Sequence, residues 1–130
     1  MFTIEQIKEA HSKVKSGADF PKYIQDLEQL GVISYTCYVS DGCTKYNGSS
    51  DYSATSDAKY NALTIAKSGN ITALKNALSI HQQGQTDYLT FCKQSAEAGV
   101  EKWVVDIDAM TCIYFDKDGG EMVKEVIPGD

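Results

Sequence analysis

The chain contains no arginine: its 12 basic residues are all lysine, against 18 acidic residues and a net charge of −6. Arginine is the preferred residue for two-pronged contacts to phosphate and guanine. Cations that displace counterions from phosphates also supply most non-specific affinity for nucleic acid. A dispersed negative charge without arginine therefore argues against a nucleic-acid partner.

Long apolar runs are also missing, and no segment approaches the roughly 18 consecutive apolar residues that cross a bilayer. The first nine residues carry charges within the first helical turns, unlike an export signal. The four cysteines show no C-x-x-C spacing, so we expect reduced and mostly buried thiols. These absences predict a soluble, cytoplasmic protein without a membrane partner.

Apolar residues at helical spacing predict four helices, which begin near Thr3, Asp19, Asn70 and either Thr86 or Asp87. Thr3 with Gln6 has the pattern of a capping box. A glycine follows the second and fourth helices, where a left-handed residue commonly ends a helix. At 130 residues the chain is long enough for a single domain, 1–130, with a conventional core.

Strand-type alternation follows each pair of helices. Residues 33–39 and 43–46 predict one hairpin with a two-residue turn at 41–42, which sets Cys37 opposite Tyr46. The polar segment that follows is expected to be a long loop with one more short strand around Tyr52.

A second hairpin is predicted from residues 103–107 and 110–114, with a last strand over 121–127. The opposite face of these strands also carries apolar residues, namely Val104, Ile113 and Phe115. Because a solvated sheet face is normally polar, a second layer or a partner is expected to cover these residues. We therefore take them as a candidate interaction face.

These elements predict an α+β fold: an antiparallel sheet of hairpins with four helices packed mainly on one face. Residues 3–46 and 70–127 follow the same ααββ plan at an offset of 68 residues, which indicates an internal duplication. Coincidence is the competing interpretation, because aromatic and glycine positions recur in any chain of helix-glycine-strand units.

No catalytic residue, metal site or cofactor is predicted. His11 and His81 each end an apolar helical stripe, and a histidine near a helix C-terminus interacts favourably with the helix dipole. That structural role is favoured over a metal or proton-transfer site, since no carboxylate or thiol lies at ligand spacing.

A second set of residues surrounds the turn between the third and fourth helices. His81, Asp87, Tyr88 and Cys92 are close in sequence and are candidates for a ligand-binding or enzymatic pocket between helices and sheet. Cys92 with His81 as its base is a weak candidate for a nucleophile, because no feature of the sequence predicts a lowered thiol pKa.

Several runs resemble one family: 3–14 (Thr-Ile-Glu-Gln-Ile-Lys-Glu-Ala-His-Ser-Lys-Val), 17–24 (Gly-Ala-Asp-Phe-Pro-Lys-Tyr-Ile), 86–92 (Thr-Asp-Tyr-Leu-Thr-Phe-Cys) and 98–106 (Ala-Gly-Val-Glu-Lys-Trp-Val-Val-Asp). They are similar to the YdfO/YbcV-like family of small, often prophage-encoded enterobacterial proteins, a domain of unknown function. The resemblance covers nearly the whole chain. The sequence departs from the family mainly in the polar loop around 47–60. It implies an α+β fold in a bacterial cytoplasm, with no catalytic residues to carry over.

The leading functional hypothesis is a non-enzymatic accessory protein that binds a host or phage protein, with a homodimer through the same face as one version of this idea. The alternatives are a small enzyme or ligand-binding domain around His81 and Cys92, and a structural component of the virion. Whether the chain is an enzyme stays open, and the lack of a catalytic signature favours a protein without enzymatic activity.

Overall fold

The computed structural model describes residues 2–14 and 19–127. Within these ranges the chain forms four helices and a six-stranded sheet. The helices are α1 (Ile4–His11), α2 (Phe20–Leu30), α3 (Ile71–Gln82) and α4 (Tyr88–Glu97). The strands are β1 (Val32–Tyr38), β2 (Thr44–Gly48), β3 (Ser53–Thr55), β4 (Val100–Asp106), β5 (Thr111–Asp116) and β6 (Glu121–Val126).

Side-chain caps explain where three of the helices begin. The predicted capping box of α1 is confirmed, because Thr3 accepts from the Gln6 amide and the Gln6 side chain accepts from the Thr3 amide. Asn70 and Asp87 cap α3 and α4 by accepting backbone amides at 3.0 and 2.7 Å. Each cap satisfies an amide that the helix itself cannot pair.

A glycine in the left-handed region follows α2 and another lies just after α4, as the sequence predicts. Gly31 has φ +101° and Gly99 has φ +87°. Their surroundings differ: a β-carbon on Gly31 would meet nothing within 4 Å, whereas one on Gly99 would lie 2.6 Å from the Ser68 carbonyl oxygen. Gly99 is therefore required both for its backbone conformation and for the close passage of the chain at Ser68.

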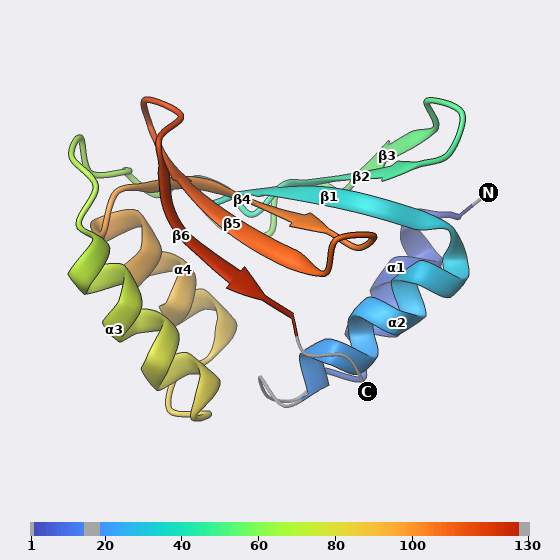
Figure 1. The fold of residues 1–130 in the computed structure, drawn as a ribbon, viewed down its shortest axis with the longest axis horizontal. Helices are drawn as coiled ribbons and strands as arrows, with labels where there is room; N and C mark the ends of the chain where they lie inside the picture. Colours follow the sequence, from blue (N-terminus) through green and yellow to red (C-terminus); the bar gives the residue numbers. More distant parts are fainter. Residues whose placement is uncertain (1, 15–18, 128–130) are drawn as a thin grey trace.

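The strand order is β3-β2-β1-β4-β5-β6, and every neighbouring pair is antiparallel. In Figure 1 the sheet lies across the top of the view, with α1 and α2 below one half and α3 and α4 below the other. The predicted fold class, an α+β protein with its helices on one face of an antiparallel sheet, is confirmed. We call the side of the sheet without helices the open face.

The first hairpin has a different register from the predicted one. Tyr35 pairs with Tyr46 and Cys37 with Thr44, two residues away from the expected partner of Cys37. The turn is longer than two residues because Val39, fully buried, leaves the hairpin and donates its amide to the Glu101 carbonyl of β4 at 3.0 Å. The sequence signal at 41–42 locates the turn correctly but not its length.

The second hairpin agrees with its predicted register, because Trp103 pairs with Tyr114 and Val105 with Cys112. The last strand and the short strand after Tyr52 are confirmed as β6 and β3. The two hairpins share one register at a constant offset of 68 residues: Thr36 pairs with Lys45, and Val104 with Ile113. Thr36 and Val104 are in turn opposite each other where β1 pairs with β4.

The core lies between the helices and the inner face of the sheet. Its fully buried side chains include Leu27 of α2 and Leu74 of α3, together with Val105 of β4. Ser95 is equally buried in α4, and its hydroxyl donates to the Phe91 carbonyl at 2.8 Å, which satisfies the polar group. The helices are thus held by apolar burial, with few polar groups in the interior.

Candidate functional site

The predicted interaction face lies on the open face of the sheet. Val104 and Ile113 are opposite each other on β4 and β5, and Phe115 follows on the same side of β5. All three side chains are half-buried, since they cover one another but none of the described helices covers them. The Lys102 ammonium lies 5.8 Å from the centre of the Phe115 ring, a cation–π contact along the same face.

Val126 extends this surface and was not among the predicted residues. It pairs with Thr111 at the edge of the sheet, and 76% of it is exposed to solvent. The alternation of β6, with Lys124 opposite Ile113, gives a sequence signal for this placement. We call Val104, Ile113, Phe115 and Val126 the apolar patch.

The corresponding positions of the first hairpin are polar. Residues 36, 45 and 47 lie 68 positions before 104, 113 and 115, and they have the same strand pairings. They are Thr36, Lys45 and Asn47. The same backbone arrangement therefore accommodates polar side chains at all three positions, so the fold itself does not require apolar residues there.

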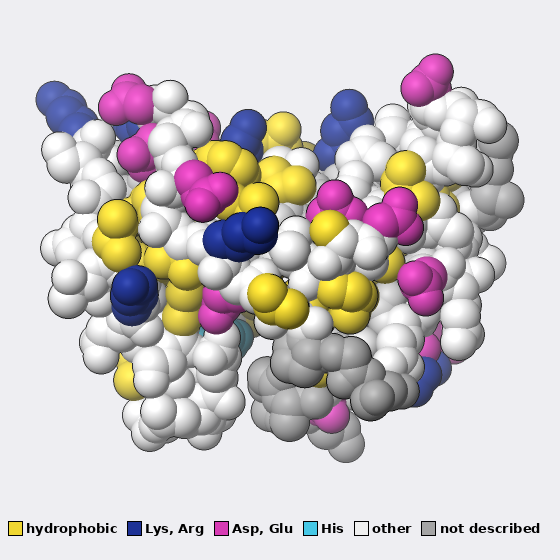
Figure 2. All heavy atoms as spheres, viewed as in Figure 1, with side chains coloured by type: hydrophobic (Ala, Val, Ile, Leu, Met, Phe, Trp, Pro, Cys, Tyr) yellow, Lys and Arg dark blue, Asp and Glu magenta, His cyan; other side chains and the backbone are white. Residues whose placement is uncertain are grey.

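Charged residues of both signs surround the apolar patch. Lys102 and Lys124 lie on the same side of the sheet as Ile113, as do Asp106 and Glu121. Figure 2 shows hydrophobic side chains across the middle of the view, over the sheet, with lysine and acidic side chains between them. An apolar centre with a mixed, charged rim is typical of surfaces that contact other proteins.

The four candidate ligand-binding residues do not converge on one cavity. The Nδ1 atom of His81 lies 3.1 Å from both the carbonyl and the hydroxyl oxygen of Thr86, and the ring stacks on Phe91 at 4.5 Å between centres. Asp87 is exposed and caps α4. Both residues thus have local structural roles at the turn between α3 and α4.

Tyr88 and Cys92 point the other way, into the core. The Tyr88 hydroxyl lies 3.4 Å from the Cys37 sulfur, and Cys92 is fully buried. Burial raises the pKa of Cys92 to about 11 and of Cys112 to about 12, and it also raises that of Cys37. A thiol whose pKa is raised by burial is a poor nucleophile at neutral pH.

His11 lies next to Tyr88 of α4. The sequence did not predict this contact. The histidine ring packs edge-on against Tyr23 at 5.3 Å and against Tyr88 at 6.1 Å between centres. Burial, and then the nearby Lys59 ammonium, lower the pKa of His11. The contact joins the end of α1 to the start of α4, two helices that are far apart in sequence.

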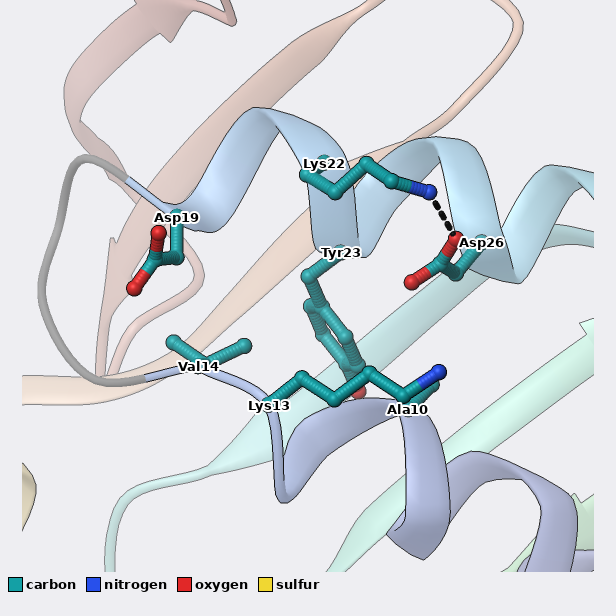
Figure 3. Close-up of a pocket in the computed structure, with 7 residues that line it drawn as sticks. All are labelled: Ala10, Lys13, Val14, Asp19, Lys22, Tyr23 and Asp26. Carbon is teal, nitrogen blue, oxygen red and sulfur yellow. Dashed lines mark hydrogen bonds and ion pairs between the residues drawn. The ribbon is translucent and has the colours of Figure 1, made fainter.

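A small cavity of about 110 Å³ lies between α1 and α2. In Figure 3 the Tyr23 side chain points from α2 towards α1 at its centre, and Lys22 and Asp26 lie along the outer side of α2. Lys22 and Asp26 form an ion pair at 2.6 Å. A volume of this size is below the roughly 300 Å³ at which small-molecule sites begin.

Residues 2–14 and 19–127 show neither a metal-ligand cluster nor a helix that could span a membrane. These residues contain no group of three or more histidine, cysteine or acidic side chains arranged to hold a metal ion. Each of their helices is too short or too polar to reach across a bilayer. All four cysteines are free thiols, and Cys43 is less buried than the other three.

A known protein family matches most of this chain. A family model described as "Protein of unknown function (DUF1398)" matches residues 8–126, from within α1 to the end of β6. The chain belongs to this family. Family membership thus covers both helix pairs and all six described strands, but the description assigns no activity to them.

Proteins of two Mycobacterium species share a shorter segment with this DUF1398 chain. It is 46% identical over 44 residues to Uncharacterized protein Rv2012 of Mycobacterium tuberculosis (strain H37Rv) and to Uncharacterized protein Mb2035 of Mycobacterium bovis. The match covers 34% of this chain and 27% of each relative, so the chain spans about a quarter of the length of these curated relatives. Neither printed name describes a function.

Proposed function

We propose that this protein is a non-enzymatic accessory protein that binds another protein through the open face of its sheet. The observation that carries the proposal is the contrast between the two hairpins. Their registers are the same, yet three equivalent outward positions hold Thr36, Lys45 and Asn47 in one hairpin and Val104, Ile113 and Phe115 in the other.

This contrast separates binding from folding as the reason for the apolar residues. If the strand pairing needed apolar side chains at positions 104, 113 and 115, the first hairpin would need them at 36, 45 and 47 as well. Exposed apolar groups with no role in folding favour unspecific association, so a contiguous patch on a soluble domain is usually a contact surface. A protein partner would remove the apolar patch from water and contact the lysine and acidic rim.

The biological setting is a further part of the proposal. The resemblance to the YdfO/YbcV-like family supports a cytoplasmic protein of a resident prophage, with a host or phage protein as its partner. A second copy of the chain is the homodimeric version of the same hypothesis. Membership of a family without a described activity is compatible with this setting but adds no support for a particular partner.

The direct test compares the wild type with a variant that carries Val104→Thr, Ile113→Thr and Phe115→Asn. Threonine replaces Ile113 because lysine, its counterpart in the first hairpin, would face Lys124 across the strands. The matched control carries Thr36→Ser and Asn47→Ser on the first hairpin. Each protein is tagged and used to capture binding partners from the host lysate, and captured proteins are retested in purified form.

We expect a purified partner to bind the wild type and the control alike and to lose at least about tenfold in affinity for the apolar-patch variant, since interface centres dominate binding energy. Sedimentation of the protein alone tests the homodimer in the same three samples. Equal binding by all three proteins, together with a monomer at every concentration, would contradict the proposal.

A further inference from the structure

A groove lies between α4 and the loop over residues 58–63, on the helix side of the molecule. Its volume is about 750 Å³, within the roughly 300–1,000 Å³ that is usual for small-molecule sites. The side chains that shape it are Lys59, Tyr60 and Leu63 from the loop and Leu89 and Lys93 from α4. Small and polar loop residues complete its wall.

The loop is held in place by hydrogen bonds to the end of the first hairpin. The amides of Lys59 and Leu63 donate to the carbonyls of Asp41 and Ser40 at 2.8 and 2.6 Å. The Tyr60 hydroxyl donates to the Val39 carbonyl, just after β1, also at 2.6 Å. A wall fixed in this way is preformed, which reduces the entropy lost when a ligand binds.

The groove is positively charged although the protein is acidic. Its lining contains two lysines and no carboxylate, in a chain of net charge −6. The single ion pair among the described residues is Lys22 with Asp26, so neither Lys59 nor Lys93 is held in a direct ion pair, although Lys93 interacts electrostatically with Asp87. Lys59 instead lies 5.8 Å from the centre of the Tyr88 ring.

The apolar part of the groove is also accessible. Leu89 lies in the first turn of α4 and is 40% exposed. Leu63 and Tyr60 are half-buried beside it. An exposed leucine next to two lysines offers apolar contact and positive charge within one preformed hollow. A ligand that is partly apolar and carries an anionic group matches both properties.

We propose that this groove binds an amphipathic carboxylate, with its apolar chain on Leu63, Leu89 and Tyr60 and its carboxylate near Lys59 and Lys93. The site is separate from the open face, since it is built from α4 and a loop on the helix side. Each proposal can therefore fail without the other.

The test is a titration of the full chain with octanoate, followed by amide chemical shifts. Octylammonium is the matched probe, because it has a chain of the same length and the opposite charge. We expect saturable shifts at residues 58–63 and 89–93 with octanoate and markedly weaker binding of octylammonium. The ring protons of His11 provide a second readout, since a bound anion would offset the effect of Lys59 on that histidine.

Three variants sharpen the result. Lys59→Gln and Lys93→Gln should each weaken octanoate binding by about two- to fivefold, the range for an exposed charge pair. Lys75→Gln on the exposed side of α3 is the matched control and should change nothing. All three positions are exposed, so folding is preserved.

Equal responses to octanoate and octylammonium would overturn the proposal, as would octanoate shifts confined to the open face. Binding that is unchanged by both Lys59→Gln and Lys93→Gln would also contradict it. So would the lack of a saturable response at octanoate concentrations below micelle formation.

Discussion

The two halves of the molecule have the same order of elements but different side chains on the open face. Residues 4–55 form α1, α2, β1, β2 and β3, and residues 71–126 form α3, α4, β4, β5 and β6. Inward positions are mostly apolar in both hairpins, for example Tyr35 and Trp103, which are both buried, and Thr44 is a buried polar exception. At three equivalent outward positions the first hairpin is polar and the second apolar, whereas Tyr38 of the first hairpin, 37% exposed, has Asp106 as its equivalent.

This difference shows which properties the fold demands. Burial against the helices requires an apolar inner face in each half, because the hydrophobic effect is the main stabilising contribution. The outer face has no such requirement, so its composition can follow another function. The strand pairing does not require the apolar patch, which is why we propose a contact with a partner for it.

The largest expected effect comes from equivalent buried positions in α2 and α4. Leu27 and Ser95 are 68 residues apart and both fully buried. Leu27→Ala should lower the free energy of unfolding by about 2–5 kcal/mol, since it leaves a cavity. Ser95→Ala removes one hydrogen bond to Phe91 and should cost only about 1 kcal/mol.

Urea denaturation of both variants measures this difference. Similar losses in the two variants would mean that the second helix pair depends on polar contacts as much as the first depends on apolar burial. The claim that apolar burial is the main stabilising contribution in both halves would then be contradicted.

Effects of similar or smaller size are expected at the two glycines near the ends of α2 and α4. Gly31→Ala should cost about 1–2 kcal/mol, because alanine is strained at positive φ but meets no neighbour. Gly99→Ala should cost more, about 3 kcal/mol or above, because its β-carbon would also lie 2.6 Å from the Ser68 carbonyl oxygen. Thermal and urea unfolding check the order, and a larger loss at Gly31 would contradict it.

The two histidines give a prediction for the pH dependence of stability. Burial lowers the pKa of both below the model-peptide value of 6.5; Lys59 adds to the effect at His11, whereas the contact with Thr86 opposes it at His81. The folded state thus binds a proton less readily than the unfolded state. The contribution of the two histidines to the free energy of unfolding is therefore complete above pH 6.5 and is lost as the pH falls below that value. The decline should depend more on His11 than on His81.

Urea midpoints of the wild type, His11→Gln and His81→Gln, measured above pH 6.5 and at about pH 5.5, test this order. The His11 variant should lose less stability on acidification than the wild type, and the His81 variant should lie between the two. An identical pH dependence in all three proteins would show that neither histidine is buried as the structure has it.

Local patterns in the sequence predict the helices, their caps and the second hairpin, because each depends on residues that are close in the chain. The first hairpin shows the limit: the Asp41-Gly42 signal is local, but the turn is lengthened by a bond from Val39 to β4. Contacts between remote segments, such as His11 with Tyr88, leave no periodic signal and could not be predicted.

The candidate site was predictable to a similar extent. Alternation along β4 and β5 correctly places Val104, Ile113 and Phe115 on one side of the sheet. Around α4 the sequence interpretation selected Tyr88 and Cys92, which point into the core, whereas Leu89 and Lys93 on the opposite side of the helix line the groove. Helical spacing separates these two faces but does not show which one the remote 58–63 loop covers.

The most direct measurement is the free energy of unfolding of the variant with Val104→Thr, Ile113→Thr and Phe115→Asn. If the apolar patch is not required for folding, the three changes together should cost less than about 2 kcal/mol, as expected for surface substitutions with the loss of one cation–π contact. A loss of more than about 5 kcal/mol, typical of core truncations, would show that these residues serve the fold and would contradict their assignment to a partner surface.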